Sequence, residues 1–145
     1  MSRVDPAVTG MIETFRATGG KLSGPAAGAP VLLLTTTGKR SGLPRTSPMT
    51  YSVDGDDLIV TAATGGQPAH PHWYHNLVAN PVVIVEIPGE TFAARAIVTE
   101  GAERDRLFRL RASERPNFAK WQQQTDRQFP LIRLRRVEQD EDPST

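Results

Sequence analysis

Apolar residues recur at two different spacings along the chain, and each spacing predicts a kind of element. Val8, Met11, Ile12 and Phe15 recur at the spacing of one helix face, which predicts a helix over residues 4–19. Further helices are predicted over residues 72–79, 100–115 and 117–126. In the helix over 100–115 the expected apolar face is Leu107, Phe108 and Leu110, and the expected solvent-facing side is Arg104, Arg106, Arg109, Arg111 and Arg115.

Short runs of β-branched and apolar residues, bounded by glycine and proline, predict strands. The clearest run is residues 31–37, which are leucine- and threonine-rich and predict a largely buried strand. The other predicted strands cover residues 45–53, 58–63, 82–87, 91–98 and 131–137. Turn signals favour antiparallel hairpins, and no βαβ rhythm is present. The pattern predicts an α+β protein, a small six-stranded antiparallel barrel with helices packed outside it.

The length of 145 residues fits one domain with a real core. Residues 1–30 are expected to form an N-terminal helix and loop, residues 31–137 the barrel domain, and residues 138–145 a disordered acidic tail. The start of the chain has no apolar segment of signal-peptide type, and every apolar run is too short to cross a bilayer. A cytoplasmic location is therefore expected, with weak peripheral membrane contact through the first helix as the alternative.

Composition narrows the classes of function. Hydrophobic residues make up 38% of the chain and charged residues 23%, as in a globular protein. The net charge of +1 argues against nucleic-acid binding. The chain has no cysteine, which excludes disulfides and thiolate metal sites.

Charge is strongly segregated along the chain. No acidic residue lies between Glu13 and Asp54, and no basic residue lies between Asp54 and Ala94. The basic residues of the first interval are Arg16, Lys21, Lys39, Arg40 and Arg45. Such segregation creates a local positive field that attracts a small anion better than a long polyanion.

The turn at Gly38–Gly42 is predicted to be an anion-binding loop for a phosphate-bearing ligand. Its glycines would let the backbone approach the ligand and present amides. The side chains expected to contribute charge or hydroxyl groups are Lys39, Arg40, Ser41, Arg45 and Thr46. The alternative is a solvated hairpin whose charges serve solubility.

Residues 64–77 gather three histidines, a Gly-Gly pair and two aromatic residues. His70, His72 and His75 could suggest zinc, but the stretch has no Cys, Asp or Glu to complete a site, so no metal is predicted. A structural role is one alternative. The other is a cofactor wall, in which glycines let a planar ring lie against the backbone and Asn76 binds a phosphate.

Several segments together resemble the deazaflavin-dependent nitroreductase family. The resemblance covers roughly residues 31–134. The segments that carry it are residues 33–42, 45–48, 65–66, 70–81 and 125–130. The run over 70–81, read as His-Pro-x-Trp-Tyr-His-Asn-Leu-x-x-Asn-Pro, is long and specific.

The resemblance implies a split β-barrel that binds coenzyme F420, an 8-hydroxy-5-deazaflavin with a phosphodiester and an oligoglutamate tail. The implied tail and phosphate contacts are Lys39, Arg40, Ser41, Arg45 and Asn76. The implied ring-side residues are Thr46, Ser47, Pro48, Met49, Thr50, Thr61, Ala62, Ala63, Thr64, His72, Trp73, Tyr74 and His75. An alternative role for one arginine of residues 100–115 is to cap the tail.

The chain departs from the nitroreductases of this family at four positions. Thr64 replaces a lysine, Ala63 a serine, and Phe118 and Trp121 replace tyrosines. Phe118 and Trp121 are therefore expected to line a more apolar substrate pocket. Tyr74 and Thr64 are the candidate catalytic residues, and the candidate proton donors are Tyr74, Tyr51 and water.

The function expected from the resemblance is an F420H2-dependent reductase that transfers a hydride to a quinone, an enone or a nitro compound. One alternative is a non-catalytic protein that binds F420 or a fatty acid. Another is an FMN-dependent oxidoreductase on the same barrel. The expected partners are a small-molecule acceptor and a second copy of the chain in a homodimer, with no nucleic acid.

Overall fold

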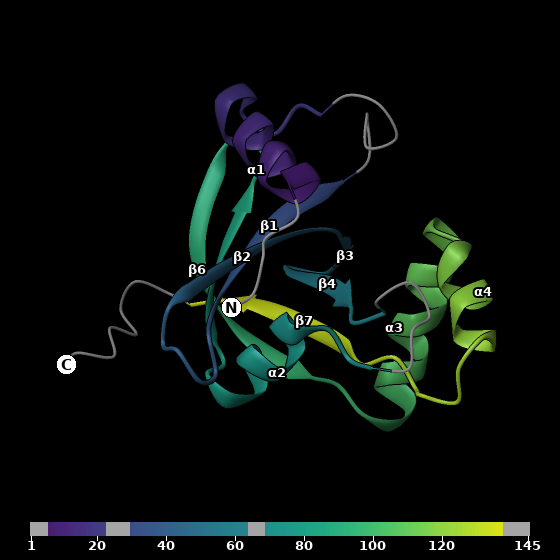
Figure 1. The fold of residues 1–145 in the computed structure, drawn as a ribbon. Coiled ribbons are helices and arrows are strands. Elements are labelled where there is room, and N and C mark those ends of the chain that lie inside the picture. The colour runs from purple at the N-terminus through teal and green to yellow at the C-terminus, as the bar shows by residue number, and fades with distance from the viewer. Residues whose placement is uncertain (1–5, 23–29, 64–68, 138–145) are drawn as a thin grey trace.

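A computed structural model describes residues 6–22, 30–63 and 69–137 (Figure 1). Over these residues the chain forms four helices and seven strands. The helices are α1 (Pro6–Thr18), α2 (His72–Ala79), α3 (Gly101–Glu114) and α4 (Asn117–Gln123). The strands are β1 (Val31–Thr37), β2 (Pro44–Thr50), β3 (Ser52–Asp54), β4 (Asp57–Thr61), β5 (Val82–Ile87), β6 (Glu90–Val98) and β7 (Leu131–Arg136). The predicted Thr64 site and the predicted acidic tail lie outside the described residues.

All strands pair antiparallel in one sheet with the order β2-β1-β5-β6-β7-β4-β3. The predicted helices and strands are present within a few residues, with one difference. The strand predicted over residues 45–53 divides at Tyr51, because β2 pairs with β1 whereas β3 pairs with β4. The Tyr51 amide donates to the Pro30 carbonyl at 3.0 Å between the two ladders.

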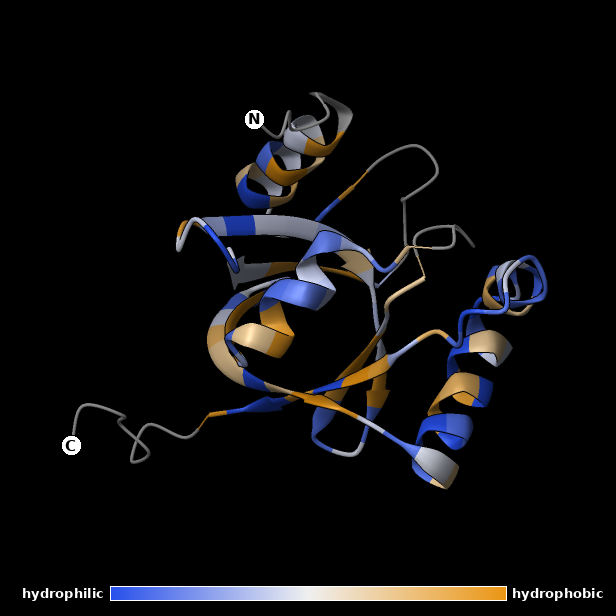
Figure 2. Cartoon of the chain, turned by 60° about the horizontal axis from the view of Figure 1, so that its bottom comes forward, coloured by the Kyte–Doolittle hydropathy of each residue, from blue (hydrophilic) through white to orange (hydrophobic). Residues whose placement is uncertain are grey.

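This division closes the sheet. β2 and β3 lie at opposite ends of the strand order, yet only Tyr51 separates them in the chain. The sheet must therefore curl until its two ends approach each other, which gives the predicted split barrel. Figure 2 shows α2 lying across one opening of the curled sheet.

The interior of the barrel is the main hydrophobic core. Its fully buried members include Leu32 and Leu34 from β1 and Leu77 from α2. Val31 and Leu33 face the other side of β1 and pack against Phe15 of α1. Because both faces of β1 are covered, its apolar run is continuous rather than alternating.

α3 and α4 pack together beside the β4 and β7 part of the sheet (Figure 1). Leu107 of α3 is buried against Ile59 and Leu131, and Phe118 of α4 is buried against Phe129. Within the described residues, no helix combines the length and apolar content needed to span a membrane.

The expectation that the α3 arginines form its solvent-facing side is wrong for two of them. Arg104 and Arg111 are only 8% and 1% exposed. Together with Leu107 they occupy positions i, i+3 and i+7, which lie on one helix face. Their charge had suggested that both side chains lie at the surface, but helical periodicity places them on the packed face of α3.

Candidate active site

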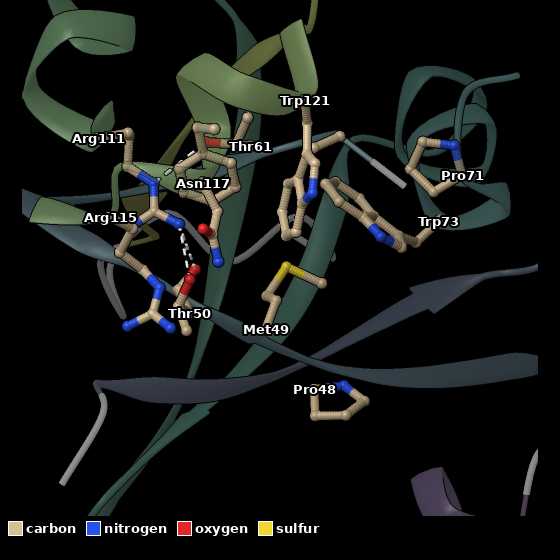
Figure 3. Close-up of a pocket in the computed structure, with 12 residues that line it drawn as sticks. Pro48, Met49, Thr50, Thr61, Pro71, Trp73, Arg111, Arg115, Asn117 and Trp121 are labelled. Carbon is tan, nitrogen blue, oxygen red and sulfur yellow. Dashed lines mark hydrogen bonds between the residues drawn. The ribbon is translucent and has the colours of Figure 1, made fainter. Parts of the chain in front are cut away.

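An open pocket of about 340 Å³ lies between β2, the end of β4, the start of α2, and α3 with α4 (Figure 3). This volume is in the range of small-molecule sites. The lining residues are Pro48, Met49, Thr50, Thr61, Ala63, Pro71, Trp73, Arg111, Arg115, Asn117, Phe118 and Trp121.

The pocket brings together residues that the sequence had assigned to the cofactor ring and residues assigned to the substrate. The ring-side residues in the lining are Pro48, Met49, Thr50, Thr61, Ala63 and Trp73, and the substrate-side residues are Phe118 and Trp121. They come from four separate segments of the chain, which meet only because the sheet curls and α4 packs beside it. The sequence did not single out Pro71, Arg111, Arg115 or Asn117 for this pocket.

One side of the pocket is apolar and aromatic. Trp73, Trp121 and Met49 point toward one another across it (Figure 3). The rings of Phe118 and Trp121 meet edge to face, with centroids 5.7 Å apart and planes at 77°. Flat, weakly polar walls of this kind suit a planar ring system.

The other side of the pocket is cationic and is dominated by the buried Arg111. Its Nε donates to Thr61 Oγ1 at 3.1 Å and its Nη1 to Ser52 Oγ at 2.9 Å. Its Nη2 donates to the carbonyl and the hydroxyl of Thr50, at 3.0 and 2.9 Å. The guanidinium also lies over the Phe118 ring, 4.7 Å from its centroid. Burial lowers the pKa of Arg111 to about 10.

Glu114 acts on Arg111 through its charge and through the bridging hydroxyl of Ser52, without a direct hydrogen bond. Ser52 accepts the hydrogen bond from Arg111 and donates its own proton to Glu114 Oε1 at 2.5 Å. The remaining bonds of Arg111 go to neutral oxygens, so its positive charge is not cancelled by direct contact.

The Gly38–Gly42 loop uses three of its amides in hydrogen bonds within the protein. The amides of Gly38 and Gly42 donate to loop carbonyls at 2.8 and 2.9 Å, and the Leu43 amide donates to Ser41 Oγ at 3.1 Å. A side chain at Gly38 would collide with Ser41 Oγ, and Gly42 has a φ of 70°. These two glycines are therefore required by the tight turn itself.

Asn76 fastens this loop to the barrel. Its Oδ1 accepts from the Lys39 amide at 3.0 Å, and its Nδ2 donates to Thr36 Oγ1 at 3.2 Å. Asn76 and Thr36 are both buried. The sequence assigned Asn76 to a phosphate, whereas the structure gives its side chain two protein partners.

The loop side chains remain suited to an anion. Lys39, Arg40 and Arg45 are exposed and form no ion pair among the residues that the structure describes. β2 runs from Arg45 to the pocket wall at Met49, a distance of about 13 Å at ordinary strand rise. The cationic loop and the pocket thus lie at opposite ends of β2.

The three histidines and Tyr74 lie outside the pocket lining, although Pro71 and Trp73 of the same segment belong to it. Tyr74 is half-buried, packs against the rings of His70 and His75 with centroids 4.7 and 5.7 Å away, and is not part of the pocket lining. His72 and His75 are exposed. No group of three metal-ligating side chains is gathered within the described ranges.

Arg127 connects the end of β4 to this segment. It donates to the Ala62 and Ala63 carbonyls at 2.8 Å each and contacts His70 Nδ1 at 2.6 Å. Burial, followed by the charges of Arg127 and His75, lowers the pKa of His70. A neutral His70 can accept a hydrogen bond from Arg127 at Nδ1.

Three further predicted residues lie near the site without lining it. The Thr46 hydroxyl forms a cross-strand hydrogen bond with the Thr35 hydroxyl at 2.8 Å. Ser47 is half-buried on β2, and Ala62 is fully buried.

Comparison with known proteins gives consistent matches. The model of the family described as F420H(2)-dependent quinone reductase matches residues 9–136. An F420H(2)-dependent quinone reductase of Mycobacterium tuberculosis is 36% identical over 126 residues, covering 84% of this chain and 85% of that protein. A solved F420-H2 dependent reductase is 35% identical with a TM-score of 0.68, over 72% of this chain and 93% of that chain. A solved chain described as a domain-swapped dimer matches with the same identity and TM-score, over 72% of this chain and 79% of its own.

Proposed function

This chain belongs to the F420H(2)-dependent quinone reductase family, and we propose that it reduces a quinone-type acceptor in the pocket of Figure 3 with a hydride from F420H2. The observation that carries the proposal is the composition of the pocket. Residues that the family resemblance assigns to the deazaflavin line it together with Phe118 and Trp121, assigned to the substrate. A hydride donor and an acceptor held there would be in contact, as direct transfer requires.

The residues present fit coenzyme F420. Its planar ring suits the aromatic side of the pocket, and its anionic tail suits the exposed cations Lys39, Arg40 and Arg45 at the other end of β2. The roughly 13 Å between Arg45 and Met49 leaves room for the chain that joins the ring to the anionic tail. In this proposal Asn76 positions the loop rather than binding the phosphate itself.

F420H2, when bound, supplies a hydride, and the quinone takes up that hydride and a proton to become a hydroquinone. Trp73, Trp121 and Phe118 would orient the acceptor and keep water away. Thr50 and Thr61 hold Arg111 in place through their oxygens. The proposed catalytic roles of Tyr74 and Thr64 stay predictions, since Tyr74 lies outside the lining and Thr64 outside the described residues.

The direct test mixes purified protein with F420H2 and menadione and follows the return of oxidised F420 in absorbance. A rate above the protein-free control is expected. Trp121→Ala should slow it, whereas Val53→Ala, at an exposed position on β3, should not. No rate above the control would refute the proposal.

Two alternatives make different predictions. A non-catalytic binding protein would bind F420 or a fatty acid in calorimetry yet reduce no acceptor in a broad panel. An FMN enzyme would bind FMN more tightly than F420 in a fluorescence titration, and it would purify as a yellow protein. Family membership favours F420 over FMN.

We also propose a homodimer. Val82 and Ile84 lie on the same face of β5 and are 47% and 41% exposed, so a second copy could cover them. The solved relative described as a domain-swapped dimer supports pairing. Peripheral membrane contact through α1 has less support, because Phe15 of its apolar face is buried against β1.

A further inference from the structure

The pocket carries more positive charge than an uncharged quinone would use. The guanidinium groups of Arg111 and Arg115 lie on one side of it together with the Asn117 amide, facing the indole rings on the other side (Figure 3). Arg115 directly follows α3, and its amide donates to the Arg111 carbonyl at 2.8 Å. The two cations therefore stand one helical turn apart on the same wall.

Neither cation is neutralised by a carboxylate in contact with it. Within the described residues, Arg111 bonds only to neutral oxygens, and Arg115 is half-buried with no ion pair. The Glu114 carboxylate forms no hydrogen bond with Arg111; it accepts one from the Ser52 hydroxyl, and its charge only partly offsets the effect of burial on the Arg111 pKa. Buried or half-buried cations are ordinarily paired, because leaving water costs them solvation.

The two arginines differ in how much freedom they have. Arg111 is held by four hydrogen bonds and by the Phe118 ring, so it acts as a fixed charge behind the wall. Arg115 makes no side-chain hydrogen bond in the described part of the chain, so its five N–H donors can turn to a ligand. A guanidinium of this kind recognises an oxygen anion with directional bonds.

From this arrangement we infer that the pocket selects acceptors that carry an anionic oxygen beside the quinone ring, such as ionised hydroxyquinones or quinone carboxylates, and that Arg115 is the specificity-determining residue. The aromatic side would hold the ring, and the cationic side would hold the anion. This inference rests on the proposed quinone reduction. It adds the chemical class of the acceptor, and the same field would stabilise the oxyanion that develops when the ring accepts a hydride.

Two naphthoquinones of nearly equal size test the inference. Lawsone carries a hydroxyl that is ionised at neutral pH, and menadione carries a methyl group at the same ring position. Trp73 and Trp121 are the only two tryptophans of the chain, and both line the pocket. Quenching of intrinsic fluorescence therefore measures binding of each quinone to the protein without any turnover.

The matched variants are Arg115→Gln and, as control, Arg109→Gln, since Arg109 is exposed on the same helix outside the pocket. Arg115→Gln should weaken lawsone binding about threefold to tenfold while changing menadione binding less than about twofold. Arg115→Lys should restore part of the lawsone affinity. The ratio of kcat/KM for lawsone to that for menadione, measured with F420H2, should fall by a similar factor in Arg115→Gln.

Two results would overturn the inference. One is equal weakening of both quinones, or of neither, in Arg115→Gln. The other is a loss of F420 affinity in Arg115→Gln with the lawsone preference unchanged, which would assign the cation to the cofactor. If the wild-type protein reduces neither quinone, the proposed function fails, yet the fluorescence titration still decides whether Arg115 selects the anion.

Discussion

Removal of the Asn76 side chain should separate two roles for this residue, contact with the cofactor and positioning of the cationic loop. Asn76→Ala deletes two hydrogen bonds, one from the Lys39 amide at 3.0 Å and one to Thr36 Oγ1 at 3.2 Å. Each bond contributes about 1 kcal/mol, and the partially buried Lys39 amide loses its partner. The expected loss in the free energy of unfolding is about 2–3 kcal/mol.

For a domain of this size that loss corresponds to a fall in Tm of about 6–9 °C. The loop would also lose its attachment to α2, so that Lys39 and Arg40 would no longer be held near the bound tail. The dissociation constant for F420 should rise about tenfold, equivalent to roughly 1.4 kcal/mol. Thermal melts followed by circular dichroism and a fluorescence titration with F420 measure the two effects.

Asn80→Ala is the matched control. Asn80 follows the same helix, and its side chain makes no hydrogen bond within the described residues, so neither Tm nor F420 affinity should change appreciably. If Asn76→Ala weakens F420 binding while its Tm stays within about 1 °C of wild type, then Asn76 contacts the cofactor directly and the positioning argument is wrong.

Three further predictions concern charge, pH and assembly. The double reversal Lys39→Glu with Arg45→Glu should raise the dissociation constant for F420 about tenfold or more at low salt and make it less sensitive to added salt. His70 has a pKa below its ordinary value of 6.5 in the folded protein. As pH falls through that value, the unfolded chain therefore binds more protons at His70 than the folded protein does. Stability should therefore fall as pH drops below about 6.5, and His70→Gln should reduce this dependence in thermal melts. Ile84→Arg should convert the proposed dimer to a monomer in size-exclusion chromatography with light scattering.

Each of these predictions has its own control. Lys21→Glu with Arg95→Glu changes net charge equally at exposed positions away from the loop and should leave F420 affinity unchanged; an equal loss there would mean that total charge, not the loop, governs binding. His72→Gln changes an exposed histidine that is not among the groups lowering the His70 pKa, so it should keep the pH dependence of the wild type. Identical profiles for wild type and His70→Gln would contradict the assignment. Val53→Arg alters an exposed apolar residue at another edge of the sheet and should leave a dimer intact.

Much of the fold follows from local pattern. The helix at α1 and the buried strand β1 are visible in the spacing of apolar residues, because that spacing reflects which side of an element is covered. The division of one predicted strand at Tyr51 is not visible, since β2 and β3 differ only in which neighbours they pair with. Those neighbours are set by the curling of the whole sheet.

The sequence by itself determined the cofactor class, the cationic loop and the aromatic residues of the pocket, because motif identity and side-chain chemistry can be read locally. Only the tertiary structure decided what Arg111 and Asn76 do. Their hydrogen-bond partners, Thr61 and Thr36, lie 50 and 40 residues away along the chain. A buried guanidinium or amide takes its role from the groups that satisfy it, and folding alone brings those groups together.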